Sequence, residues 1–263
     1  MNQPPDAPPF ESAAAYYDRF RAPYPAEAFG HIRSAFNLDA RTRVLDLDCG
    51  PGTVAIALCG AAVEVVAVDP EARMLAQGER LARAREARNI RWVHATAENF
   101  AFEGGRFRAV TMGQSFHWMD RDAVLDRLAD FIEDGGGLAL INPGKRRPQE
   151  SWEDVAGAVV TKYLGRRRRH PKAHPQAEHE PALRRSAHFS VFTAREFASE
   201  IERDIPSIVG CLYSTTMAAK PLFGDRAGAF ERDLSEALLR LNPSGVFKER
   251  LETEVLIAPK AMR

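Results

Sequence analysis

The chain has little cysteine, no net charge and no long apolar segment among its 263 residues. Three widely spaced cysteines, an odd number, favour reduced thiols over a disulfide framework. The longest run of apolar residues and glycine, residues 54–63, spans ten positions, whereas a membrane-spanning helix needs about 20. The 36 basic and 36 acidic side chains cancel, which argues against a general nucleic-acid-binding protein. We therefore expect a cytoplasmic protein that has neither a membrane nor a nucleic acid as partner.

What the chain does contain is typical of a globular protein. Its composition is 45% hydrophobic and 27% charged, and a chain of this length buries enough apolar surface to fold without a metal or a disulfide. Residues 1–9 hold four prolines and no basic side chain. This composition predicts a disordered tail and not a signal peptide.

Short apolar strands alternate with helices between residues 43 and 141. This order predicts βαβ units and a doubly wound, mostly parallel sheet that is covered on both faces. The predicted strands are residues 43–48, 63–68, 90–94, 107–112 and 137–141, and the helices between them are residues 53–62, 71–88 and 121–132.

The alternation stops after Asn142, and the pattern there predicts a helical insertion. Thr193 and Glu196 form a capping-box pattern, which predicts a helix at Ala194–Arg203 after a short strand at Phe189–Phe192. The predicted organisation has four parts. They are the tail (1–9), a cofactor-binding core with N-terminal lid helices (10–144), a cap that holds the substrate (145–230), and a C-terminal helix and strand that complete the core (231–263).

A glycine-rich turn after the first strand carries the chemistry. The turn Gly50-Pro51-Gly52 precedes a helix, so a ligand can approach the backbone and meet the helix N-terminus. As a bare pattern it also fits a dinucleotide-binding fingerprint. However, Asp46 and Asp48 would face the phosphates of a dinucleotide, whereas they attract the ammonium and sulfonium groups of S-adenosylmethionine. The charges therefore favour S-adenosylmethionine.

Five segments resemble the class I S-adenosylmethionine-dependent methyltransferases. The turn resembles motif I of the family, residues 66–75 resemble its ribose-binding strand end and helix, and residues 94–100 resemble its adenine-binding segment. Residues 107–120 and 17–25 resemble a small-molecule subgroup related to trans-aconitate-type methyltransferases. The resemblance covers residues 16–142 and implies a Rossmann-like sheet of seven strands with a helical cap.

The resemblance also implies which residues bind the cofactor. The methionine end is assigned to the turn, the ribose to the end of the second strand, the adenine to two later segments, and the cofactor carboxylate to the N-terminal lid. In chain order the predicted cofactor-binding residues are Tyr17, Arg21, Tyr24, Asp46, Asp48, Cys49, Gly50, Gly52, Asp69, Pro70, Met74, Thr96, Ala97, Glu98, Gly113, Gln114 and Trp118.

Two of these positions depart from the family pattern. Asp48 stands where the family has glycine, and its carboxylate can hold the cofactor ammonium, repel the cofactor carboxylate or pair with Arg21. Thr96 stands where the family has an aspartate that binds the adenine amino group, which leaves Glu98 or the backbone at Ala97 to do so. The sequence leaves the effect of both departures open.

His117 is the candidate catalytic base. It follows the fourth strand at the carboxyl edge of the sheet, and an imidazole with a pKa near 6.5 can accept a proton from a methyl acceptor. The alternative is that His117 only shapes the pocket. The histidines of the insertion, at positions 170, 174, 179 and 188, and the run Arg166–Arg169 are interpreted as a solvated loop, so no metal site is predicted.

The sequence thus predicts an S-adenosylmethionine-dependent methyltransferase, a monomer or homodimer, that acts on oxygen, nitrogen or carbon of a small molecule. Three alternatives stay open. They are a cofactor-binding homologue with weak or no methyl transfer, a nucleotide-dependent oxidoreductase, and an RNA methyltransferase suggested by the arginine run.

Overall fold

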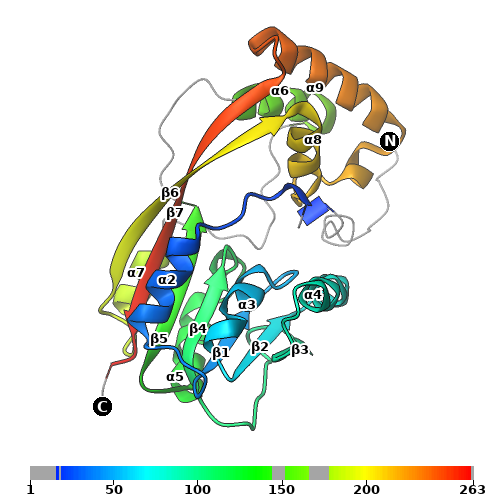
Figure 1. Cartoon of the computed structure of the whole chain (residues 1–263). Helices are drawn as coiled ribbons and strands as arrows, with labels where there is room; N and C mark the ends of the chain where they lie inside the picture. The colour runs from blue at the N-terminus through cyan, green and yellow to red at the C-terminus, as the bar shows by residue number, and fades with distance from the viewer. Residues whose placement is uncertain (1–15, 18, 144–151, 166–177, 262–263) are drawn as a thin grey trace. The chain divides into compact units, whose positions relative to one another are not determined.

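A computed structural model describes residues 16–17, 19–143, 152–165 and 178–261 (Figure 1). The tail 1–9, the run Arg166–Arg169, His170 and His174 lie outside the described residues. The chain divides into two compact units. We call residues 24–145, 172–198 and 252–263 the core unit, and residues 1–23, 146–171 and 199–251 the second unit.

One seven-stranded sheet organises the fold, with the strand order β3-β2-β1-β4-β5-β7-β6. Strands β3, β2, β1, β4 and β5 pair in parallel, and β7 pairs with β5 in the antiparallel direction. This order confirms the doubly wound, mostly parallel sheet. The strands are β1 Arg43–Leu47, β2 Glu64–Asp69, β3 Ile90–His94, β4 Phe107–Gly113, β5 Ile132–Pro143, β6 Thr193–Asp204 and β7 Val246–Pro259.

Alternate residues of the central strands enter two separate cores, one on each face of the sheet. Val44 of β1 packs in a cluster with helices α2 (Ala26–Ala35) and α3 (Thr53–Leu58), which also includes Leu75 of α4 (Ala72–Ala84). The next residue, Leu45, packs on the opposite face in a cluster with α5 (Arg121–Phe131) and α7 (His179–Arg185). Both faces of the sheet are therefore covered, which explains the nearly continuous apolar strands.

The second unit has its own aromatic core. Helices α6 (Trp152–Leu164), α8 (Ile205–Tyr213) and α9 (Ala227–Leu241) and the 3₁₀ segment η4 (Lys220–Arg226) contribute to it. The rings of Phe223 and Phe230 stack with their centroids 4.0 Å apart. A buried ion pair, Arg203 Nε to Glu249 at 2.6 Å, joins β6 to β7. This unit therefore buries apolar and charged groups of its own, as a separate compact unit does.

The predicted helix at Ala194–Arg203 is wrong, because these residues form β6. Burial along β6 alternates, with Phe197, Ser199, Ile201 and Arg203 more buried than the residues between them. A period of two is that of a strand, and it outweighs the helix propensity of Ala, Glu and Arg and the capping-box pattern. The predicted strand at Phe189–Phe192 is also wrong, since this segment is a loop in which Phe189 is fully buried.

The described units also divide the C-terminal half differently from the predicted cap and core. Helix α7 and Phe189, which fall within the predicted cap at 145–230, pack in the core unit. Helix α9, most of which falls within the predicted core segment 231–263, belongs to the second unit. None of the described helices is both long enough and apolar enough to cross a bilayer.

Candidate functional site

Asp46 and Asp69 lie buried at the carboxyl ends of β1 and β2, and each accepts a hydrogen bond from a backbone N–H group. The Asp46 carboxylate accepts the Ala55 N–H of α3 at 3.1 Å and the Thr111 hydroxyl of β4 at 2.7 Å. Burial raises the pKa of Asp46 to about 7, against the lowering effect of these two hydrogen bonds. Asp46 therefore joins β1, α3 and β4 beneath the turn at which a ligand was predicted.

Asp69 holds the glycine turn from the end of β2. Its two oxygens accept the N–H groups of Gly50 at 2.7 Å and Glu71 at 2.8 Å. Burial raises the pKa of Asp69 to about 6, so this carboxylate is ionised at neutral pH. A carboxylate oxygen can accept more than one hydrogen bond, so Asp69 keeps capacity for the hydroxyls of a ribose.

Two glycines shape the turn between β1 and α3. Gly50 and Gly52 have φ of 55° and 76°, in the left-handed region that glycine favours. A Cβ at Gly52 would collide with the Trp92 ring of β3. The Cys49 N–H donates to the Val68 carbonyl at 3.0 Å, which fixes the turn against the end of β2.

Asp48 is the exception in this turn. It has φ of 47°, although it is not a glycine, and it is partly buried. Its carboxylate has no hydrogen-bond partner in the described part of the chain, and burial and the charges of Asp69, Glu98 and Asp46 raise its pKa to about 8. The structure therefore brings Asp46, Asp48 and Asp69 together, and their mutual repulsion favours a bound cation.

The predicted adenine-binding residues lie on α4 and on the turn after β3. Met74 and Ala97 are buried and Glu98 is exposed. The Thr96 hydroxyl accepts the Asn99 N–H at 3.2 Å, so this side chain stabilises its own turn. Pro70, after β2, is exposed, and its carbonyl lies 2.8 Å from Nε2 of His94.

The end of β4 brings Gly113 and Tyr24 together. A Cβ at Gly113 would lie 2.9 Å from Cγ2 of Val54 and 3.2 Å from the Tyr24 hydroxyl, so a side chain there would displace one of them. Gln114 follows with φ of 54°, and its N–H donates to the Ile141 carbonyl at 2.8 Å. Tyr24 thus lies against the end of β4 within the core unit.

The two other predicted lid residues belong to the second unit. The Arg21 guanidinium donates to the Ser214 hydroxyl at 2.9 Å and lies over the Tyr17 ring at 5.1 Å. Ser214 caps the C-terminus of α8. Within its own unit, Arg21 therefore binds the end of a helix.

His117 lies in a short 3₁₀ segment, η2 (Phe116–Trp118), directly after β4. Its Nδ1 is buried without a hydrogen-bond partner, and its ring lies 4.9 Å from that of Trp118. Burial, with a further contribution from the positive charge of Arg121, lowers the pKa of His117 to about 4. His117 is therefore neutral at physiological pH and can accept a proton.

Comparison with known proteins shows what the segment that holds this site is similar to. Residues 44–136, which contain the turn, the acids and His117, match the model of a methyltransferase domain family. This match covers less than half of the chain, and it shows that the segment is similar to methyltransferase domains. An uncharacterized methyltransferase of Mycobacterium tuberculosis is 33% identical over 151 residues, which cover 57% of this chain and 58% of that protein.

Solved structures share the fold of this chain at low sequence identity. A putative type II methyltransferase from Anaeromyxobacter dehalogenans has a TM-score of 0.67 at 20% identity, covering 92% of this chain and 98% of that one. A methyltransferase from Thiobacillus denitrificans, solved with S-adenosyl-L-homocysteine, has a TM-score of 0.55 at 16% identity, covering 98% of this chain and 100% of that one. These matches confirm the predicted fold class.

His179 is a buried residue that the sequence analysis placed in a solvated loop, and that prediction is wrong. The side chain is 2% exposed on α7, and both ring nitrogens are buried without a partner. Its ring lies 5.2 Å from that of Phe116 and 6.4 Å from that of His117. The sequence signal for a buried helix there is weak, because Ala182 and Leu183 are two apolar residues within a stretch rich in charge and proline.

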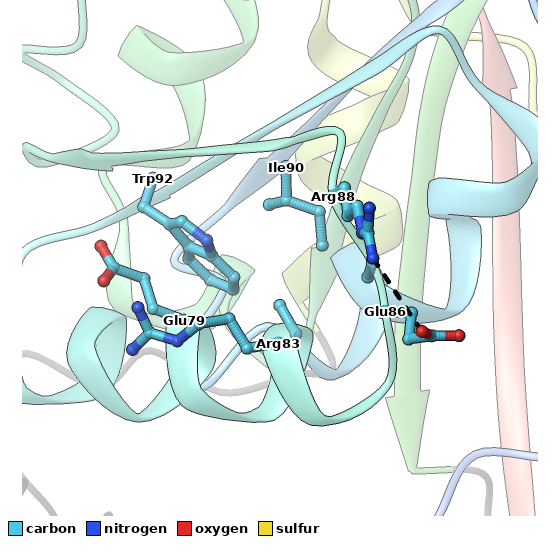
Figure 2. Close-up of a pocket in the computed structure, with 8 residues that line it drawn as sticks. Glu79, Arg83, Glu86, Arg88, Ile90 and Trp92 are labelled. Carbon is cyan, nitrogen blue, oxygen red and sulfur yellow. Dashed lines mark ion pairs between the residues drawn. The ribbon is translucent and has the colours of Figure 1, made fainter.

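Thr111 and Trp92 also support the site, and the sequence analysis named neither. Thr111 is a polar residue in the apolar strand β4, a pattern that could have indicated a buried hydrogen bond. Trp92 lines a cavity of about 470 Å³ between α4 and β3, with Glu79, Arg83, Glu86 and Arg88 around it (Figure 2). The acidic and basic side chains in its lining balance, and Asp46, Asp48 and Asp69 are not among its lining residues. Its Trp92 ring also packs on Gly52 of the turn.

Proposed function

We propose that this chain transfers a methyl group from S-adenosylmethionine to a small-molecule acceptor. The observation that carries the proposal is the set of three carboxylates, Asp46, Asp48 and Asp69, at the glycine turn of a methyltransferase domain. These groups suit a ligand that is cationic at one end and carries a ribose. They do not suit the two phosphates of a nicotinamide dinucleotide, because Asp46 and Asp48 would face them without a counter-charge.

The residues present fit the cofactor. The backbone at Gly50 and Gly52 admits the methionine end, where Asp48 presents an unpartnered carboxylate. Asp69 accepts hydrogen bonds from the ribose hydroxyls, and Met74 and Ala97 pack against the adenine. Because the Thr96 hydroxyl is used within its own turn, Glu98 is the acid that accepts from the adenine amino group.

The bound cofactor supplies a methyl group on a positively charged sulfur, which an acceptor atom attacks in line. The protein aligns the acceptor and removes its proton. His117 takes that proton, because its lowered pKa keeps it neutral at physiological pH. A low pKa also makes it a weak base, so His117 serves best for an acceptor whose proton leaves as the new bond forms. Tyr24, beside Gly113, closes the methionine end.

The test separates small-molecule from macromolecular acceptors. The purified protein is incubated with S-adenosylmethionine carrying a tritiated methyl group and with a cell extract divided into low-molecular-weight, RNA and protein fractions. The proposal predicts label in the low-molecular-weight fraction that falls at least about tenfold with His117→Asn, in line with the loss of a general base. Label only in RNA would establish an RNA methyltransferase. Micromolar cofactor binding without label in any fraction would establish a binding homologue.

A further inference from the structure

Asp48 has a property that cofactor binding alone does not explain. Its backbone occupies the left-handed region, which suits glycine, yet the side chain there is a carboxylate. Asp46 and Asp69 each accept two hydrogen bonds from the protein. The Asp48 carboxylate accepts none from the described residues. Its negative charge is therefore not stabilised within the core unit.

Among the described residues, the charged groups that act on Asp48 are all acidic. Burial raises the pKa of Asp48 most, and Asp69 at the end of β2, Glu98 in the turn after β3 and Asp46 of β1 raise it further. Together they bring it to about 8. Because Asp69 has a pKa of about 6, it is ionised at neutral pH, and Asp48 beside it holds a proton. The free protein thus keeps one neutral carboxyl group at the methionine end of the turn.

We infer that Asp48 distinguishes the methyl donor from the demethylated product by the charge on the sulfur. The inference rests on the proposed function, since it takes the turn to hold the methionine end. S-adenosylmethionine carries one net positive charge at neutral pH, whereas S-adenosylhomocysteine carries none. A positive charge within this cluster of acids favours the ionised form of Asp48, and a neutral thioether does not.

This difference in ligand charge determines when Asp48 releases and takes up its proton during donor binding and methyl transfer. When the donor binds, the positive charge on its sulfur would favour release of the Asp48 proton to solvent and would attract the resulting carboxylate. When the methyl group leaves, the sulfur becomes neutral, and Asp48 takes a proton back from solvent. The product then lacks the attraction that held the donor. Asp48 therefore favours donor binding over product retention, and it does so more strongly as the pH rises toward 8.

Isothermal titration calorimetry with both ligands tests the inference. Donor and product are titrated into the wild-type protein at pH 6.0 and pH 7.5, each in two buffers of different ionisation enthalpy. Asp48→Asn removes the titration but keeps the size of the side chain and tolerates a left-handed backbone. Asp130→Asn, which changes an exposed acid of α5, is the matched control.

For the wild type and Asp130→Asn, we expect donor affinity to rise roughly tenfold from pH 6.0 to 7.5, which corresponds to the release of about 0.7 proton on average across this range. Product affinity should change less than about threefold, with no proton release. In Asp48→Asn, both ligands should show the weak pH dependence of the product. The comparison with this variant also cancels any titration of the ligands themselves.

The outcomes separate the inference from the proposed function. If the wild type and Asp48→Asn bind the donor with the same pH dependence, or if the product releases as many protons as the donor, the inference is wrong and the function stands. If neither ligand binds any of the three proteins, the proposed function itself is wrong.

Discussion

Replacing His179 by phenylalanine should make the core unit more resistant to acid. The folded protein keeps His179 neutral, because burial, with the charges of Arg121 and His117, lowers its pKa from 6.5 to about 3. In the unfolded chain the same ring takes a proton below pH 6.5. Stability is therefore fully present above pH 6.5, is lost as the pH falls, and stops changing once the pH passes below about 3.

The size of the effect follows from the distance between the pH and the pKa of the unfolded chain. At pH 5.0 the pH lies 1.5 units below 6.5, and each unit corresponds to about 1.4 kcal/mol, so His179 removes about 2 kcal/mol relative to pH 7.5. Phenylalanine fits among the aromatic neighbours of His179, since the Phe116 ring centroid lies 5.2 Å away. It also removes two buried nitrogens that have no hydrogen-bond partner.

Urea unfolding at pH 7.5 and pH 5.0 measures this effect. The free energy of unfolding should fall by about 2 kcal/mol more in the wild type than in His179→Phe on moving to pH 5.0. His188→Gln is the control, because that imidazole is not enclosed, and it should behave as the wild type does. Equal losses in the wild type and His179→Phe would refute the conclusion that a neutral, buried His179 joins α7 to the core.

Three further substitutions test separate contacts. Thr111→Val removes a donor from the buried Asp46 carboxylate and should cost about 1–3 kcal/mol in urea unfolding, whereas an unchanged stability would mean that this hydrogen bond is replaced. Arg203→Met removes the guanidinium from its buried ion pair with Glu249 and should cost about 3–5 kcal/mol, measured by thermal denaturation, with exposed Arg240→Met as a control that changes little. Gly113→Ala places a Cβ 2.9 Å from Cγ2 of Val54. It should weaken cofactor binding measured by calorimetry, while circular dichroism should show that the fold is retained. Unchanged affinity would place the ligand away from β4.

The sequence predicted the fold of the core unit because its signals are local. Each central strand is a short apolar run bounded by a turn or a helix, and both faces of the sheet are covered, as the two core clusters show. The acids and glycines of the glycine turn could be placed for the same reason. They are adjacent to strand ends, and parallel strands bring their carboxyl ends to one edge.

The sequence could not predict features that depend on distant partners. Residues of β6 carry helix-forming side chains and a capping-box pattern, but their place in the sheet is decided by pairing with a strand far along the chain. His179 is buried because α7 packs against α5, more than 50 residues earlier, and no local pattern specifies that contact. The left-handed backbone of Asp48 could not be predicted either, since an aspartate in a sequence does not indicate such a conformation as a glycine does.

Equilibrium binding to the wild type and to Asp69→Asn tests the central claim, that the acids at the ends of β1 and β2 hold S-adenosylmethionine, most directly. At pH 7.5 the wild type should bind S-adenosylmethionine with a dissociation constant in the micromolar range and bind NAD negligibly. Asp69→Asn, which keeps the side-chain shape but loses the charge, should bind at least about tenfold more weakly, since a charged hydrogen bond contributes about 1.5–3 kcal/mol. Binding of NAD without S-adenosylmethionine, or equal affinity in the two proteins, would contradict the claim.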